Sequence, residues 1–257
     1  MQDTARTPVG DRRVRALFVS DLHLDDTRPQ ITDLFLDFLR AEAASAEALY
    51  IPGDLFEAWI GDDDDAELPA RVADALRAVA DGGTQVFFIR GNRDFLLGDG
   101  YAARAGFSIL PDPCVITAGG EPILLLHGDL LCWDDTAYLA VRRQVRDRQW
   151  QQALLARSLP ERRAFALAAR QSSAQHQQSM VRLEVGDAAP RAVEDYFRRY
   201  GVDRMIHGHT HRPAVHDLEV DGRARQRIVL GDWYEQGSVL RLYRDGRFEL
   251  AGLRLSD

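Results

Sequence analysis

Short apolar runs alternate with amphipathic segments along the first third of the chain. The apolar runs have the length of strands and cover residues 14–20, 48–51 and 85–89. The segments between them repeat apolar side chains at helical spacing and cover residues 29–46 and 68–80. This order of strand, helix, strand, helix and strand predicts a parallel sheet with right-handed crossovers.

Farther along the chain, the pattern changes to strands joined by short turns. Residues 114–117 and 122–126 flank the turn-like segment 118–121, which predicts a hairpin. More strands are expected at residues 204–206, 227–230, 238–243 and 248–250. These strands predict a second, partly antiparallel sheet.

Residues 136–200 carry no strand pattern. They are rich in arginine, glutamine and alanine, with apolar residues at helical spacing, and Pro160 and the stretch 186–190 divide them into at least three predicted helices. We therefore expect a core of residues 14–135 and 201–257, a helical insertion of residues 136–200 and a flexible tail of residues 1–13.

Composition narrows the class of protein and its partners. The 257 residues, 46% of them hydrophobic, can bury a substantial core. The basic residues are all arginine, and the net charge of −8 argues against a surface that coats a polyanion, so we expect no nucleic-acid partner. Cys114 and Cys132 are too few for a disulfide framework, which favours a reducing compartment. Without a secretory signal or a bilayer-length apolar run, we expect a cytoplasmic product that is soluble or peripheral to a membrane.

Five short polar signatures are placed where strands are expected to end. They are Asp21-Leu22-His23, Gly53-Asp54, Gly91-Asn92-Arg93-Asp94, His127-Gly128-Asp129 and His207-Gly208-His209-Thr210-His211. Each one alone is compatible with a turn, since Asp, Asn and Gly are ordinary turn residues. Together they contain five of the seven histidines, and the carboxyl ends of strands in open α/β sheets meet in one crevice. We therefore predict that the signatures converge on one metal site.

The types of ligand narrow the chemistry. His209 and His211 share one face of an extended segment, whereas His207 starts that segment and is left out of the ligand set. His216 and His176 are assigned to the surface or the substrate side. Asp, Asn and His without cysteine suit manganese, iron(II), cobalt or zinc in an open site. Two such ions about 3.5–4 Å apart can bind a hydroxide and clamp both oxygens of an in-line displacement, which predicts hydrolysis of a phosphoester or pyrophosphate.

The order of the signatures resembles the calcineurin-like metallophosphoesterase superfamily, except that Arg93 stands where its Gly-Asn-His-Asp/Glu element has histidine. The resemblance implies an α/β fold in which two packed mixed β-sheets are flanked by helices. It implies one divalent ion held by Asp21, His23, Asp54 and His211. A second ion would be held by Asp54, Asn92, His127 and His209. The shared Asp54 carboxylate would reduce the repulsion between the two cations.

Four longer segments resemble, within that superfamily, the UDP-2,3-diacylglucosamine pyrophosphatases. They are residues 54–63, 91–98, 207–216 and 229–238. The resemblance implies hydrolysis of UDP-2,3-diacylglucosamine to UMP and 2,3-diacylglucosamine 1-phosphate (lipid X) in lipid A biosynthesis, with two Mn²⁺ ions. It also implies a peripheral protein at the cytoplasmic face of the inner membrane, and a lid, formed by the insertion, whose apolar lining admits acyl chains.

The resemblance implies catalytic roles for Asn92, Arg93 and His209, which also contact the substrate. Arginine does not usefully donate a proton at pH 7, but it can bind a pyrophosphate oxygen bidentately. Asp135 and Tyr138 match substrate-contacting positions, although a helix N-cap and a packing aromatic explain them equally well.

The lid segment departs from the family pattern. Ser173 matches a substrate position, but no lysine occurs near Met180. The candidates to replace that lysine are Gln175, His176, Gln177 and Arg182. Two alternatives stay open: a metallophosphoesterase for a smaller nucleotide or phosphomonoester, and a metal-bearing interaction module without catalysis.

Overall fold

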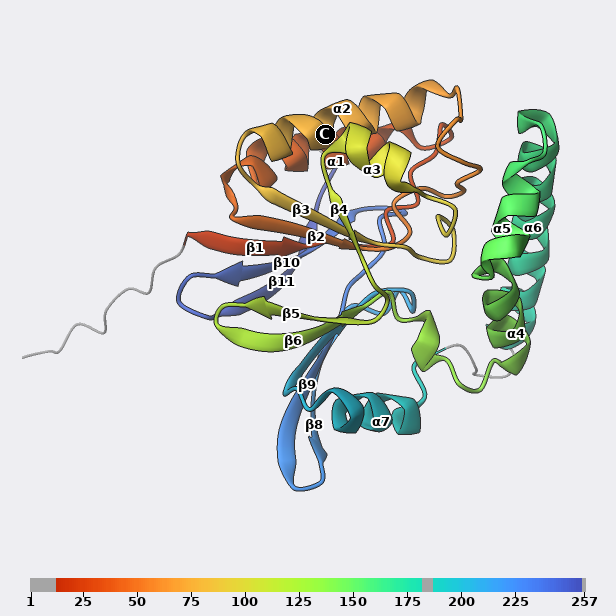
Figure 1. Cartoon of the computed structure of the whole chain (residues 1–257). Helices are drawn as coiled ribbons and strands as arrows, with labels where there is room; N and C mark the ends of the chain where they lie inside the picture. Colours follow the sequence, from red (N-terminus) through yellow and green to blue (C-terminus); the bar gives the residue numbers. More distant parts are fainter. Residues whose placement is uncertain (1–12, 182–186, 256–257) are drawn as a thin grey trace, which may run out of the picture.

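Two β-sheets pack face to face, with helices on their outer sides (Figure 1). The computed structural model describes residues 13–181 and 187–255, without the side chains of residues 173–181. Residues 1–12 of the predicted tail lie outside these ranges. Both sheets contain parallel and antiparallel pairs, which confirms the predicted α/β fold of two packed mixed sheets.

The first sheet has six strands in the order β11-β10-β1-β2-β3-β4. In chain order they are β1 Val14–Phe18, β2 Ala48–Pro52, β3 Gln85–Ile89, β4 Ser108–Leu110, β10 Gly237–Tyr243 and β11 Phe248–Leu253. Its outer face is covered by α1 Pro29–Ala41, α2 Glu67–Asp81 and α3 Asp99–Ala105 (Figure 1). The short α3 and β4 were not predicted. The first helix ends earlier than expected because the chain turns into η1 Ala43–Ser45, where the Thr84 hydroxyl donates to the carbonyls of Ala43 and Ala46.

The second sheet has five strands in the order β5-β6-β7-β9-β8. They are β5 Cys114–Ala118, β6 Glu121–Leu126, β7 Arg204–His207, β8 Ala214–Val220 and β9 Arg223–Val229. The edge strand β8 was missed because most of its side chains are exposed and no apolar run marks it. Helix α7, Pro190–Tyr200, packs on the outer face through Val193 and Phe197. It was grouped with the insertion in the sequence, but its apolar contacts are with this sheet.

The other three helices of the segment stand beside the sheets, next to the loops at one end of the strands (Figure 1). They are α4 Thr136–Val145, α5 Arg148–Leu155 and α6 Leu159–Val181. We call these three helices the insertion helices. Helix α4 buries no residue, and α5 buries Leu154. Among the described helices, none combines the length and apolarity that crossing a membrane requires.

Candidate metal centre

The loops that follow β1, β2, β6 and β7 are joined by hydrogen bonds at one edge of the sheets. Asp21 N–H donates to Gly53 O, so the loops after β1 and β2 run side by side. Gly208 N–H donates to His127 O and joins the loops after β6 and β7. The two pairs are connected because His209 N–H donates to the Asp21 carboxylate at 3.0 Å. Four of the five predicted signatures are therefore brought together by hydrogen bonds from backbone N–H groups.

The backbone at this edge is strained. Six non-glycine residues of the described chain have a positive φ, and five of them are predicted metal ligands. These five are Asp21, His23, Asp54, His209 and His211, with φ from 48° to 68°. Such a conformation costs roughly 1–3 kcal/mol per residue and persists only where the surrounding structure enforces it. The surrounding structure therefore offsets this cost and fixes the direction in which the five side chains point.

Two glycines leave room for the carboxylates. A Cβ at Gly91 would lie 2.1 Å from Asp54 Oδ1, and a Cβ at Gly208 would lie 2.1 Å from Asp21 Oδ2. Any other residue would push the carboxylate away from the site. The Gly-Asn and Gly-His pairs of the signatures thus have a steric reason.

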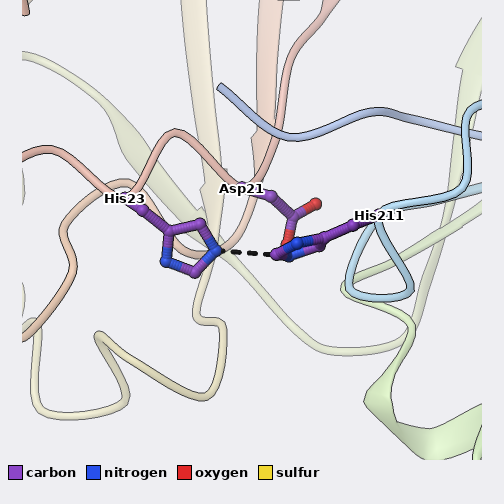
Figure 2. Close-up of side chains that lie close together, drawn as sticks. All are labelled: Asp21, His23 and His211. Carbon is purple, nitrogen blue, oxygen red and sulfur yellow. Dashed lines mark hydrogen bonds and ion pairs between the residues drawn. The ribbon is translucent and has the colours of Figure 1, made fainter. Parts of the chain in front are cut away.

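Asp21, His23 and His211 form what we call the first cluster (Figure 2). The Nε2 atoms of His23 and His211 face each other at 3.3 Å. Asp21 Oδ1 lies 3.4 Å from His211 Nε2. Two imidazole nitrogens and a carboxylate oxygen that converge in this way form a donor set suited to a divalent ion.

Asn92, His127 and His209 form what we call the second cluster. Asn92 Oδ1 lies 2.9 Å from both His127 Nε2 and His209 Nδ1, and the two nitrogens are 3.2 Å apart. Asp54 Oδ2 is 3.8 Å from His127 Nε2 and also 3.8 Å from His23 Nε2. A single Asp54 oxygen therefore faces both clusters, which is the position that a bridging ligand needs.

The charges of the centre suit cations. Burial opposes protonation of His127, but Asp54, Asp129 and Asp21 raise its pKa to about 9. Burial and the neighbouring His127 lower the pKa of His209 to about 4. Burial alone would raise the pKa of Asp21, yet the surrounding histidines hold it well below its ordinary value. A buried group of carboxylates that draws in a proton in this way offers the same field to a metal ion.

The structure brings all seven predicted ligands together. Three form each cluster, and Asp54 lies between the clusters. His207 lies in neither cluster, because its Nδ1 lies 2.8 Å from Gly208 O. His216 sits on the edge strand β8. His176 lies outside the described side chains, as do the other candidates for the missing lysine.

A cavity of about 350 Å³ separates the insertion helices from the core. Asn92, Arg93 and Tyr138 line it where it borders the second cluster. Farther along, its wall is largely apolar and includes Trp59, Ile60, Phe95, Leu96, Val141 and Phe165. Arg93 Nε is buried and has no hydrogen-bond partner among the described residues, so it can serve an anionic ligand in the cavity.

The other three predicted substrate contacts have different surroundings. Asp135 caps α4 by accepting from Tyr138 N–H at 2.9 Å, which is the structural role considered for it. The Tyr138 ring lies 5.7 Å from the His209 ring, and its hydroxyl donates to Asp129 Oδ2. The side chain of Ser173 lies outside the described residues.

Two supporting carboxylates were given no role from the sequence, although Asp94 stands in one of the five signatures. Asp94 accepts the N–H groups of Leu55 and Gly91 and joins the loops after β2 and β3. Asp112 accepts His127 N–H and also binds Arg142 of α4. Their signal was weak because a carboxylate that binds backbone N–H groups has no characteristic spacing.

Two more acidic side chains stand behind the first cluster. Glu57 lies 3.3 Å from His23 Nδ1, and Asp232 lies 3.4 Å from His211 Nδ1. Both fall in the segments 54–63 and 229–238 that carry the family resemblance, and neither had been given a role.

Comparison with known proteins gives one family. Residues 14–213 match the family described as calcineurin-like phosphoesterase. A curated relative from Stenotrophomonas maltophilia (strain K279a), named UDP-2,3-diacylglucosamine hydrolase, is 58% identical over 90% of this chain and 95% of its own. A relative of the same name from Xanthomonas oryzae pv. oryzae (strain PXO99A) is 60% identical over 90% of this chain and 96% of its own. A solved archaeal phosphodiesterase covers 93% of this chain and 99% of its own, with 12% identity and a TM-score of 0.45.

Proposed function

Because the chain belongs to the calcineurin-like phosphoesterase family, we propose that it hydrolyses the pyrophosphate bond of UDP-2,3-diacylglucosamine in lipid A biosynthesis. The products are UMP and 2,3-diacylglucosamine 1-phosphate. The observation that carries the proposal is 57–60% identity, over 90% of this chain, to relatives named for hydrolysis of this compound. The cavity beside the two clusters has the polar and apolar parts that such a substrate needs.

Each cluster has a defined part in the reaction. Two divalent ions held there would supply a nucleophile at neutral pH and neutralise charge on the reacting phosphate. Asp54 sets the two sites close together, since one of its oxygens faces both. Asn92 lines the cavity where it borders the second cluster, and His209 Nδ1 lies 2.9 Å from Asn92 Oδ1. The two side chains would hold the phosphate in line.

Arg93 stabilises the negative charge that develops on the pyrophosphate. Its backbone N–H donates to Asp54 Oδ1 at 2.8 Å, which fixes the residue next to the bridging carboxylate. An arginine side chain binds phosphate oxygens through its forked N–H groups and is not suited to act as a general acid. A phosphate leaving group needs less protonation than an alkoxide does, and this permits arginine where related enzymes have histidine.

The apolar part of the cavity is proposed to hold acyl chains. Trp59 and Leu96 of the core and Val141 and Phe165 of the insertion helices line it. An acyl chain that enters gains roughly 0.8 kcal/mol for each buried methylene group. This gain discriminates a diacylated substrate from an unacylated one.

Manganese is the proposed ion, since the centre combines carboxylate, amide and imidazole ligands without sulfur. Removal of bound metal with a chelator, followed by addition of Mn²⁺, Mg²⁺, Co²⁺ or Zn²⁺ singly, tests this choice. We expect the largest recovery of UMP release with Mn²⁺. Full recovery with Mg²⁺ alone and none with Mn²⁺ would refute it.

Peripheral association with the cytoplasmic face of the inner membrane is also proposed. Leu155 and Leu167 project from the insertion helices with 39% and 57% of their surface exposed. Apolar side chains among arginines suit an anionic bilayer surface. Co-sedimentation with anionic vesicles should weaken in Leu167→Ser. The control Val215→Ser alters a comparably exposed residue on β8 and should bind as the unmodified protein does.

The decisive test of the substrate is a comparison of rates. UMP release from UDP-2,3-diacylglucosamine and from unacylated UDP-glucosamine is measured with saturating Mn²⁺. We expect kcat/KM to be at least about 100-fold higher for the diacylated compound, because several methylene groups enter the cavity. Equal rates would favour a hydrolase of smaller nucleotides, and no turnover of either would reject the proposal.

A further inference from the structure

Glu57 connects a metal ligand to an insertion helix. Its side chain is 7% exposed and lies behind His23, with Oε2 at 3.3 Å from His23 Nδ1. Its other oxygen, Oε1, lies 3.2 Å from Arg170 Nε on α6. The two carboxylate oxygens of one residue therefore face two different parts of the molecule.

The contact with His23 is on the side away from the metal. His23 Nε2 faces His211, while its buried Nδ1 lies 3.3 Å from Glu57 Oε2 and makes no hydrogen bond with any other described residue. A carboxylate beside the remote nitrogen of a histidine ligand fixes its tautomer and increases its basicity. Glu57 is suited to this task because its backbone N–H donates to Leu24 O, which holds it against the loop of His23.

The contact with Arg170 connects Glu57 to α6, one of the insertion helices. Arg162 attaches an earlier turn of α6 to the core through Ile60 O. Eight residues farther along, a distance of about 12 Å on a helix, Arg170 reaches Glu57 beside the metal centre. This part of α6 and His23 therefore contact the same carboxylate.

We propose that Glu57 is a positioning residue that couples occupancy of the first cluster to the placement of α6 over the cavity. A bound ion fixes His23, His23 fixes one oxygen of Glu57, and the other oxygen then holds Arg170. The proposal rests on the metal centre of the proposed function and not on the identity of its substrate.

The first test is metal affinity without substrate, in Glu57→Gln. Glutamine keeps the size of the side chain and removes its charge. We expect Mn²⁺ to bind the weakened site about 10–100-fold less tightly, measured by the paramagnetic resonance of free Mn²⁺ during titration. Affinity equal to that of the unmodified protein would overturn the proposal.

The second test is hydrogen–deuterium exchange in residues 160–172, with and without saturating Mn²⁺. The unmodified protein should exchange more slowly when loaded, and both Glu57→Gln and Arg170→Gln should lose this difference. Asp232→Asn is the matched control. Asp232 lies beside His211 in the same way, but its carboxylate binds Tyr234 N–H instead of an arginine of α6, so the difference should remain.

The outcomes separate coupling from a general loss of structure. Arg170 is 43% exposed, so its substitution leaves the fold intact even if Glu57→Gln were unstable. Metal-dependent protection that persists in Arg170→Gln, or that is absent from the unmodified protein, would overturn the proposal. Because no substrate is present, neither outcome reflects on the choice of UDP-2,3-diacylglucosamine.

Discussion

The metal centre and the insertion helices are held in place by opposite means. In the centre, Asp21, Asp54 and His127 are at most 1% exposed, and tight loops fix the backbone around them. The insertion helices bury few residues and attach through arginine side chains such as Arg142 and Arg162. The difference teaches that the reacting groups are placed by the backbone, whereas access to them is set by side chains. Substitutions in the metal centre should therefore affect the chemical step, and substitutions in the insertion helices should affect access of the substrate to it.

The largest effect is expected in the centre, for Asp54→Ala. Loss of the carboxylate that faces both clusters leaves two cations unshielded from each other, so at least one should dissociate. We expect turnover to fall by more than about 10³-fold. Metal content and the rate of UMP release are measured together, with the exposed Asp37→Ala as control. Two bound ions and an ordinary rate would contradict the shared role of Asp54.

Arg93→Ala should slow the chemical step and leave the metal centre intact. The loss of its charge should lower kcat about 10²–10³-fold while two ions remain bound. Arg93→Lys keeps the charge without the bidentate geometry, so its kcat should lie between that of the unmodified protein and that of Arg93→Ala. A change in KM alone would show that Arg93 binds the substrate equally in the ground state and transition state.

The same contrast explains what the sequence could predict. The strand ends and the seven ligands are visible because apolar runs and Asp, Asn and His signatures are local features. The left-handed conformation of Asp21 and His23 is not visible in the sequence, since their backbone N–H groups donate to Gly53 and Asp54, in a loop distant in sequence.

The supporting side chains were hidden for a related reason. Glu57 and Asp232 contact residues far along the chain. Both stand in segments that carry the family resemblance, but no local spacing shows what either side chain contacts. Helix α7 looks like the insertion helices in composition, and only packing of Phe197 on the second sheet distinguishes it.

Metal affinity should depend on pH through the second cluster. The pKa of His127 is raised to about 9, so at neutral pH the metal-free side chain carries a proton that an ion must displace. His209, whose pKa is lowered to about 4, has none to lose. Affinity should therefore rise by up to about tenfold per pH unit from pH 6 to pH 8. Burial opposes protonation of His211 in the first cluster, but Asp21 raises its pKa as well. Calorimetry in buffers of different ionisation enthalpy should therefore detect at least about one proton released, and no release would contradict the raised pKa values.

The smallest effects are expected where the insertion helices meet the core. Arg162 is 3% exposed and donates to Ile60 O and Arg157 O, so Arg162→Ala should lower the free energy of unfolding by about 1–2 kcal/mol. Its neighbour Arg163 pairs with carboxylates at the surface, and Arg163→Ala should cost less. Denaturant unfolding compares them, and equal losses would show that burial does not decide how the insertion is attached.

The most direct test of the account is a crystal structure of the protein loaded with Mn²⁺, with anomalous scattering used to locate the ions. We expect two peaks. One should lie among Asp21, His23 and His211, the other among Asn92, His127 and His209, with Asp54 in contact with both. A single peak, or peaks away from these residues, would contradict the two-ion centre.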